Sequence, residues 1–201
     1  EDKINDFLKI SGKLAQKAVK LSKKNIEIAG SLPTRGETYK SDIFLSDKEL
    51  LGEFYESDSI LNPYVDLFYL DVLCSYKEIE LALESIKLFE KDIIVGVHLK
   101  DTGKLPSGEN ITGLKNILSK YKIRAVIGGC ISPEIYQKVS TELKELNYEY
   151  GFKINAFENI PDDWSITPNA NPNLSLGKRS DLDSDSFVDF CKHAINDGAS
   201  Y

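Results

Sequence analysis

The sequence predicts an α/β protein built around a parallel sheet, and three observations support this. Short apolar segments alternate five times with segments of helical periodicity. The apolar segments are hydrophobic on both faces, as strands are when helices cover a parallel sheet. The chain has 201 residues, enough to bury one sizeable core. This alternation favours right-handed crossover connections within a single sheet.

Each expected element follows from its local pattern. The first residues carry apolar side chains at helical spacing, Ser46 and Glu49 have the spacing of a capping box, and Pro133 stands in the first turn of a helix. The expected elements are helix 1–24, strand 26–31, helix 46–61, strand 65–72, helix 77–90, strand 92–99, helix 110–121, strand 123–131, helix 133–146 and strand 150–157, with a further helical pattern around residues 187–191.

Residues 158–183 interrupt this rhythm. The segment is rich in Pro, Asn and Asp, and a connection of this length is usually functional or disordered. Trp164, the only tryptophan, lies in it. Packing against the fold is the favoured interpretation of Trp164, and contact with a ligand at the open end of a barrel is the alternative.

Composition argues against several classes of protein. The formal charge of -7 and the pI near 5.0 give no electrostatic reason to expect nucleic acid or an anionic membrane as a partner. The apolar runs are shorter than a membrane-spanning helix requires, and no secretory leader opens the chain. Three widely spaced cysteines do not suggest a disulfide framework. We therefore expect a soluble, cytoplasmic protein.

Periodicity alone leaves open whether the sheet is doubly wound or closed into an eight-stranded barrel. The sequence holds no G-x-G-x-x-G, no phosphate-binding loop and no G-x-S-x-G motif. In both architectures ligands bind at the carboxyl ends of the strands. The candidate residues expected there are Ser31, Asp71, His98, Cys130 and Asn155.

Each candidate also has a structural interpretation. Asp71 ends an apolar run and either binds a ligand or has a structural role as a helix cap or loop residue. His98 is expected to be a structural hydrogen-bonding residue, and the other histidine, His193, falls on a predicted surface helix. Cys130 precedes a helix that begins at Pro133, and is either a reactive thiol or a small buried residue.

Six segments, in order, carry a resemblance to one family. The sequence reads Ala29-Gly30-Ser31, Val65 to Asp71, Lys104-Leu105-Pro106-Ser107-Gly108, Cys130-Ile131-Ser132-Pro133-Glu134, Ile154-Asn155-Ala156-Phe157 and Leu176 to Leu182. Taken in the same order, these segments resemble six features of the homocysteine S-methyltransferases. The features are the third strand, the D-x-x-x-x-E-T strand, the G-K-L-x-x-G loop, the N-C-x-x-P-E motif, the end of the seventh strand and the L-G-x-R-x-D-L motif. The resemblance extends through nearly the whole chain.

The resemblance implies a (β/α)8 TIM-type barrel that is incomplete in this chain. Residues 1–201 would form a single partial barrel domain, with strands three to seven and the start of the eighth at Gly198. Strands one and two and the terminal Gly-Gly-Cys-Cys motif would be missing. An open barrel exposes two sheet edges. We therefore expect the missing strands, or association into a homo-oligomer, to cover them.

The resemblance also implies a function in methionine biosynthesis. In this family three cysteines hold zinc; Cys130 matches one, and the other two are expected beyond Tyr201. The homocysteine sulfur takes the fourth position and attacks a methyl group of a small donor, forming methionine. Asp71 would bind the substrate ammonium, and Ser31 and Asn155 are further expected substrate-binding residues. Asp71 replaces the usual Glu, and Gly129 replaces the usual Asn before the cysteine.

Two other functions stay open. A metal-free, non-catalytic homologue could use the same scaffold to bind a ligand or a partner. A different barrel enzyme, such as an aldolase or isomerase, could use Asp71 and His98, but would need a catalytic lysine, and only Lys100 lies just past a strand.

Overall fold

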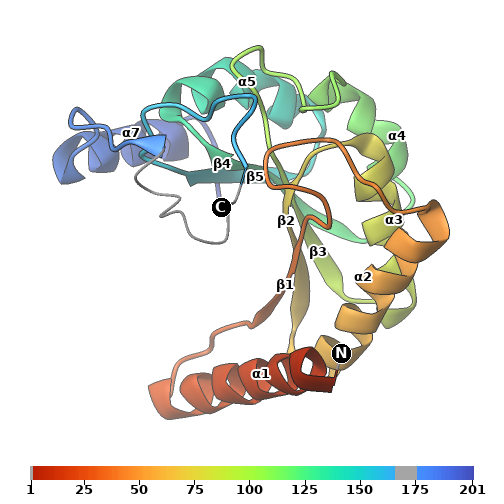
Figure 1. Ribbon diagram of the computed structural model, residues 1–201. Coiled ribbons are helices and arrows are strands. Elements are labelled where there is room, and N and C mark those ends of the chain that lie inside the picture. Colours follow the sequence, from red (N-terminus) through yellow and green to blue (C-terminus); the bar gives the residue numbers. More distant parts are fainter. Residues whose placement is uncertain (1, 166–175) are drawn as a thin grey trace.

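The computed structural model describes residues 2–165 and 176–201, which contain one curved parallel sheet (Figure 1). Its strand order is β1-β2-β3-β4-β5, so each strand pairs with its neighbour in sequence. The strands are β1 (Ala29–Pro33), β2 (Leu67–Leu73), β3 (Asp92–Val97), β4 (Ile123–Ile131) and β5 (Glu149–Ile154). The predicted α/β class with a parallel sheet is confirmed, and the barrel to which this sheet corresponds is not closed by the described residues.

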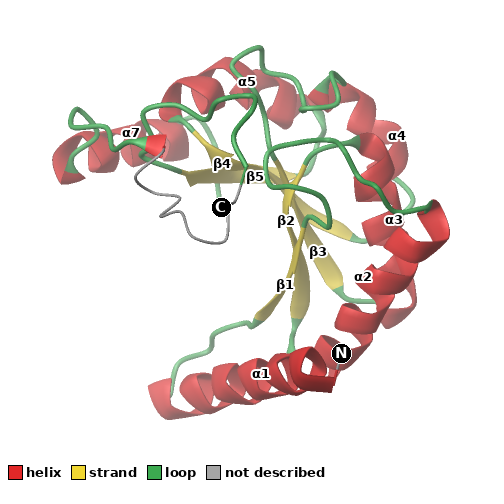
Figure 2. Ribbon diagram, viewed as in Figure 1, coloured by secondary structure: helices red, strands yellow, loops and turns green. Residues whose placement is uncertain are grey.

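The described helices lie along the outer, convex side of the sheet, and none of them covers its concave side (Figure 2). The α-helices are α1 (Asp2–Ser22), α2 (Asp47–Leu61), α3 (Tyr76–Ile86), α4 (Leu114–Leu118), α5 (Pro133–Glu145) and α7 (Ser184–Asn196). Between helices and sheet lies a core of buried side chains that includes Phe54, Leu83, Val95, Leu118 and Val139. Among the described residues, this core therefore lies on the convex side of the sheet.

Most predicted elements form, with shifted ends. The predicted strand 26–31 begins only at Ala29, and the predicted strand 150–157 ends at Ile154. The helix expected over 77–90 leaves α geometry at Lys87 and ends at Glu90, which has a left-handed φ of 56°. The helix expected over 110–121 is a short 3-10 turn followed by the five residues of α4. The capping box at Ser46 is confirmed.

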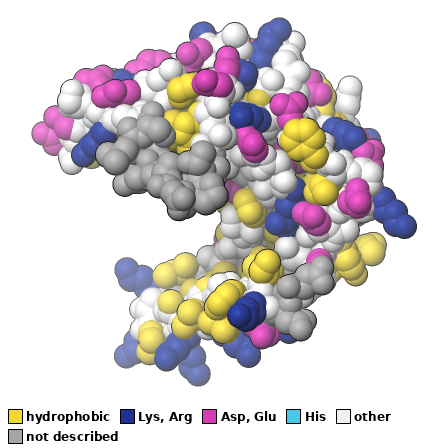
Figure 3. Space-filling view, in the orientation of Figure 1, with side chains coloured by type: hydrophobic (Ala, Val, Ile, Leu, Met, Phe, Trp, Pro, Cys, Tyr) yellow, Lys and Arg dark blue, Asp and Glu magenta, His cyan; other side chains and the backbone are white. Residues whose placement is uncertain are grey.

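Helix α1 forms as predicted, but much of its apolar side does not join the core. Ile4, Phe7, Leu14 and Leu21 are exposed, and apolar side chains are visible along this helix in Figure 3. At Gly12, α1 packs closely against Tyr64: a Cβ on Gly12 would lie 2.6 Å from the Tyr64 side chain. A glycine is therefore required at that contact.

The last residues run alongside β5. The Ser200 amide donates to the Tyr150 carbonyl at 2.9 Å, and the Phe152 amide donates to the Tyr201 carbonyl at 3.0 Å. Both contacts advance in the same direction along the two segments, as in a parallel pair. The eighth strand is expected to start at Gly198; residues 198–201 are not a regular strand, but they make these two hydrogen bonds to β5. In the described parts of the chain, no helix is long and apolar enough to cross a membrane.

Candidate functional site

A cavity of about 590 Å³ lies at the carboxyl ends of β3, β4 and β5. This is the end at which parallel α/β sheets bind ligands. Its lining includes Tyr39, His98, Cys130, Asn155, Trp164 and Arg179. The cavity therefore brings together three of the five candidate residues, His98, Cys130 and Asn155.

An irregularity at the end of β4 positions Cys130. The pairing of β4 with β5 shifts register between Gly129 and Ile131, and Cys130 has a positive φ of 54°. Asn155 holds this backbone, because its Nδ2 donates to the Cys130 carbonyl at 2.7 Å. A left-handed conformation is unusual for a residue other than Gly, so the local backbone is strained where the thiol meets the cavity.

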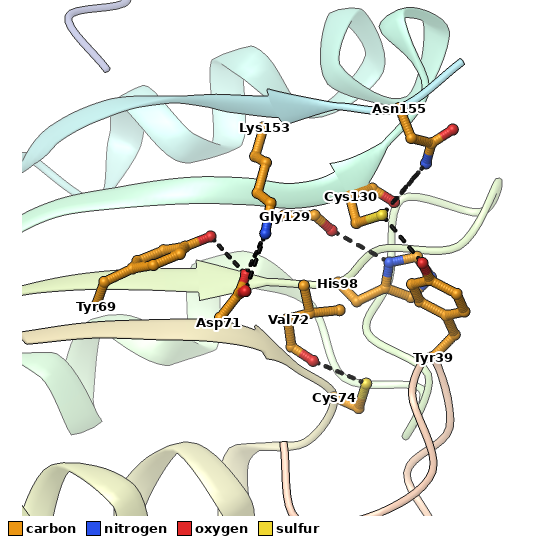
Figure 4. A network of polar contacts seen from close by, with 10 residues as sticks. All are labelled: Tyr39, Tyr69, Asp71, Val72, Cys74, His98, Gly129, Cys130, Lys153 and Asn155. Atoms are coloured by element: carbon orange, nitrogen blue, oxygen red, sulfur yellow. Dashed lines mark hydrogen bonds and ion pairs between the residues drawn. The ribbon is translucent and has the colours of Figure 1, made fainter. Parts of the chain in front are cut away.

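Tyr39 covers the thiol of Cys130 (Figure 4). Its hydroxyl lies 3.1 Å from the Cys130 Sγ, at hydrogen-bonding distance. The ring lies 4.7 Å from that of His98 and 5.4 Å from that of Trp164, centroid to centroid. Burial and the neighbouring Cys130 raise the pKa of Tyr39, so the phenol is neutral at pH 7. Trp164 thus both packs against Tyr39 and lines the cavity.

His98 lines the cavity but is buried, and its ring contacts the backbone of the fold. Its Nδ1 lies 3.3 Å from the Gly129 carbonyl, and burial lowers its pKa to about 4. The ring is therefore neutral at pH 7. His193, by contrast, is exposed on α7, with its Nδ1 2.6 Å from the Asp189 carbonyl. Lys100 lies at the cavity, and its Nζ pairs with Asp162 at 2.8 Å.

Asp71 lies on the concave face of the sheet, outside the described lining of the cavity. Lys153 of β5 reaches across the sheet and places its Nζ 2.8 and 2.9 Å from the two carboxylate oxygens. The Tyr69 hydroxyl donates to Oδ1 at 2.8 Å.

Ser31 is exposed on β1, opposite Tyr69 in the strand register, and it too is absent from the described cavity lining. Sequence reasoning did not identify Tyr39 or Lys153.

The residues present do not form a zinc site by themselves. Across residues 2–165 and 176–201, no group of three or more His, Cys, Asp or Glu side chains could hold a metal ion. Cys74 is buried, its thiol donates to the Val72 carbonyl, and burial with the nearby Glu78 raises its pKa. Cys191 belongs to α7. Cys130 therefore offers one thiol, whereas zinc in proteins takes three or four protein ligands.

Comparison with known proteins identifies the family. The family model described as homocysteine S-methyltransferase matches residues 1–201. The chain belongs to the homocysteine S-methyltransferase family. The family expected from the sequence is thereby confirmed, and it is a family of methyl-transferring enzymes.

Solved structures agree on the fold. The apo form of the homocysteine methyltransferase MmuM from Escherichia coli matches with a TM-score of 0.61 and 15% identity, over 76% of this chain and 70% of that one. The metallated form of MmuM matches with a TM-score of 0.62 and 16% identity, over 75% of this chain and 66% of that one. Among curated protein sequences no relative matches. At such identities the likeness to MmuM demonstrates a shared fold.

Proposed function

We propose that this homocysteine S-methyltransferase family member transfers a methyl group to the thiol of homocysteine, forming methionine. The observation that carries the proposal is the position of Cys130. In a chain of this family, this thiol stands at the carboxyl end of a parallel strand and lines a cavity of about 590 Å³. A cavity of this volume is large enough for a small amino acid beside a small donor.

The reaction needs few groups from the protein. The homocysteine sulfur loses its proton and forms a bond to the methyl carbon, while the bond from that carbon to the donor heteroatom breaks. The electron pair of the broken bond stays with the donor. A sulfonium or a quaternary ammonium donor loses its positive charge in this step, and the thiol proton goes to solvent. A folate nitrogen is neutral, so a donor of that kind must also take up a proton, which balances the one that the thiol releases. The role of the chain is then to hold the two reactants in line.

The roles that we propose for individual residues follow from their positions. Asn155 fixes the backbone of Cys130 and also lines the cavity. Asp71 offers a carboxylate to the substrate ammonium, and Ser31 stands on the same concave face through its register with Tyr69. Zinc is the metal expected for the family, and it would supply Lewis acidity that lowers the pKa of a bound thiol. The described residues do not complete such a site.

The test is methyl transfer by the complete, reduced protein. Homocysteine is incubated in turn with a sulfonium, a quaternary ammonium and a methylated folate donor, and methionine is measured by mass spectrometry. We expect one donor to support turnover, and Cys130→Ser to lower the rate by about 100-fold or more, the loss expected for a group central to the chemistry. Cys191→Ser on α7 is the matched control and should retain the wild-type rate. Full activity of Cys130→Ser, or no methionine from any donor, would contradict the proposal.

A metal-free binding protein is the second candidate, and the small number of metal-ligating side chains at the cavity favours it. The described residues contribute one thiol to the cavity, and this thiol is covered by Tyr39. Zinc content of the complete, reduced protein separates the two candidates. About one zinc per chain supports the enzyme. Absence of zinc together with absence of methyl transfer supports the binding protein.

A further inference from the structure

The carboxylate of Asp71 is already occupied by an ammonium group from the chain itself. Lys153 Nζ lies almost equally close to both oxygens, at 2.8 and 2.9 Å, and Tyr69 donates to one of them. The Lys153 ammonium also lies 5.7 Å from the centroid of the Tyr69 ring. Figure 4 shows its side chain extending from β5 across the sheet to Asp71 on β2. The Lys153 ammonium thus pairs with the same Asp71 carboxylate that we propose binds the substrate ammonium.

The intervening strands leave room for this contact. A Cβ on Gly96 of β3 would lie 2.8 Å from the Tyr69 hydroxyl and 2.7 Å from the Leu70 carbonyl. Glycine is therefore needed where the Tyr69 ring crosses β3. On β4 the residue beside Lys153 in the register is Gly129, which immediately precedes Cys130. Gly96 and Gly129 thus contribute no side chain from β3 and β4 at these two positions, while Val72 of β2 lies nearby, its Cγ2 3.6 Å from where a Cβ on Gly129 would be.

The pair also lies close to the thiol. In the strand register Lys153 lies beside Gly129, the residue that immediately precedes Cys130. The Tyr69 hydroxyl, which donates to Asp71, has its pKa raised by burial and by both Asp71 and Cys130. Lys153 retains conformational freedom, because 48% of its side chain is exposed, whereas only 20% of the Asp71 side chain is. A flexible cation facing a fixed, half-buried anion can be displaced by a competing cation.

We propose that Lys153 is a specificity-determining residue that competes with the substrate's α-ammonium for Asp71. The inference rests on the proposed function and refines it. An amino-acid thiol binds only as Lys153 releases the carboxylate, and a thiol that lacks an amino group binds with the Lys153–Asp71 pair intact. The pair therefore lowers the preference of the site for amino-acid thiols over plain thiol acids.

The experiment compares two probes by calorimetry under reducing conditions: homocysteine, and 4-mercaptobutyrate, which has the same carbon chain without the amino group. Lys153→Met keeps the length of the side chain and removes the charge. We expect Lys153→Met to raise the preference for homocysteine, as the ratio of the two dissociation constants, by about fivefold, the equivalent of one exposed or half-buried ion pair. Lys153→Arg should keep the wild-type ratio, and adding Asp71→Asn to Lys153→Met should abolish the gain.

Lys122→Met is the matched control, because Lys122 pairs with Asp92 at 2.7 Å at the opposite ends of the strands. It should leave the ratio unchanged, and circular dichroism checks that each variant is folded. A ratio that stays constant or falls in Lys153→Met, while both thiols still bind, overturns this inference and leaves the proposed function intact. Failure of both thiols to bind to any variant overturns the proposed function and the inference with it.

Discussion

Asp58 is a fully buried carboxylate between α2 and α3. Ser85 donates to its Oδ2 at 2.5 Å, whereas Oδ1 has no hydrogen-bond partner among the described residues. Burial raises the pKa of Asp58 to about 7, against the smaller opposing effects of the Ser85 hydroxyl and the Arg35 charge. The native protein therefore binds a proton that the unfolded chain releases at much lower pH.

Asp58 should make stability depend on pH. Because the folded pKa is raised, the stabilisation is complete below the unfolded pKa near 4 and is lost as pH rises through about 7. Asp58→Asn should remove this dependence. The free energy of unfolding of the variant relative to wild type should rise by about 2 kcal/mol between pH 5 and pH 8. Urea titrations at each pH measure it.

Asp6→Asn on the exposed side of α1 is the control for removing a carboxylate that is not buried. A pH-independent difference for Asp58→Asn would show that Asp58 stays ionised in the folded protein.

The residues of the site were predictable only in part. The carboxyl ends of predicted strands placed Asp71, Cys130 and Asn155 at the correct edge of the sheet, because strand ends follow from apolar runs. Their contacts did not follow, since Lys153 is 82 residues from Asp71 and Tyr39 is 91 residues from Cys130 in the sequence. Such pairs depend on the curvature of the sheet and on the path of a loop, neither of which has a local signal.

At the level of the elements, local chemistry predicted the beginnings of helices better than their ends. The Ser46 capping box and Pro133 in a first turn predicted where α2 and α5 begin, and in the structure Ser46 and Ser132 each accept a hydrogen bond from an amide of the first turn. The end of α3 had no comparable signal, because its apolar periodicity continues through Leu88, which is 82% exposed. A periodic pattern predicted helix there, whereas the chain turns at Glu90 through a left-handed residue.

The capping box of α2 provides a direct test. The Ser46 side chain accepts from the Glu49 amide, and Glu49 accepts from the Ser46 amide at 2.9 Å. Ser46→Ala removes the hydrogen bond from the Glu49 amide to the Ser46 side chain and should lower the free energy of unfolding by about 1 kcal/mol. Chemical denaturation with an unchanged m-value measures it. Ser59→Ala, later in the same helix, should cost less than about 0.5 kcal/mol, and equal losses for the two variants would contradict the role of the cap.

Across the whole molecule, the two ends of the sheet carry different groups. The cavity, Cys130 and Asp71 lie at the carboxyl ends of the strands. At the amino ends, Arg124 links β4 to β3 and to the segment before β1, through Asp92 at 2.6 Å and Glu27 at 2.7 Å. In parallel α/β folds the amino ends generally serve stability and the carboxyl ends serve function. Here one guanidinium joins three segments that are far apart in the sequence.

Arg124→Met should therefore separate stability from binding. The substitution leaves Glu27 without its guanidinium and Asp92 with Lys122 alone at 2.7 Å, so the urea midpoint should fall. The loss should shrink in 1 M salt, because these groups are partly solvent-exposed and salt screens their attraction. The dissociation constant for homocysteine should stay within about twofold of wild type, since the substitution lies at the opposite end of the strands. A larger change in affinity at an unchanged urea midpoint would mean that the two ends of the sheet are coupled.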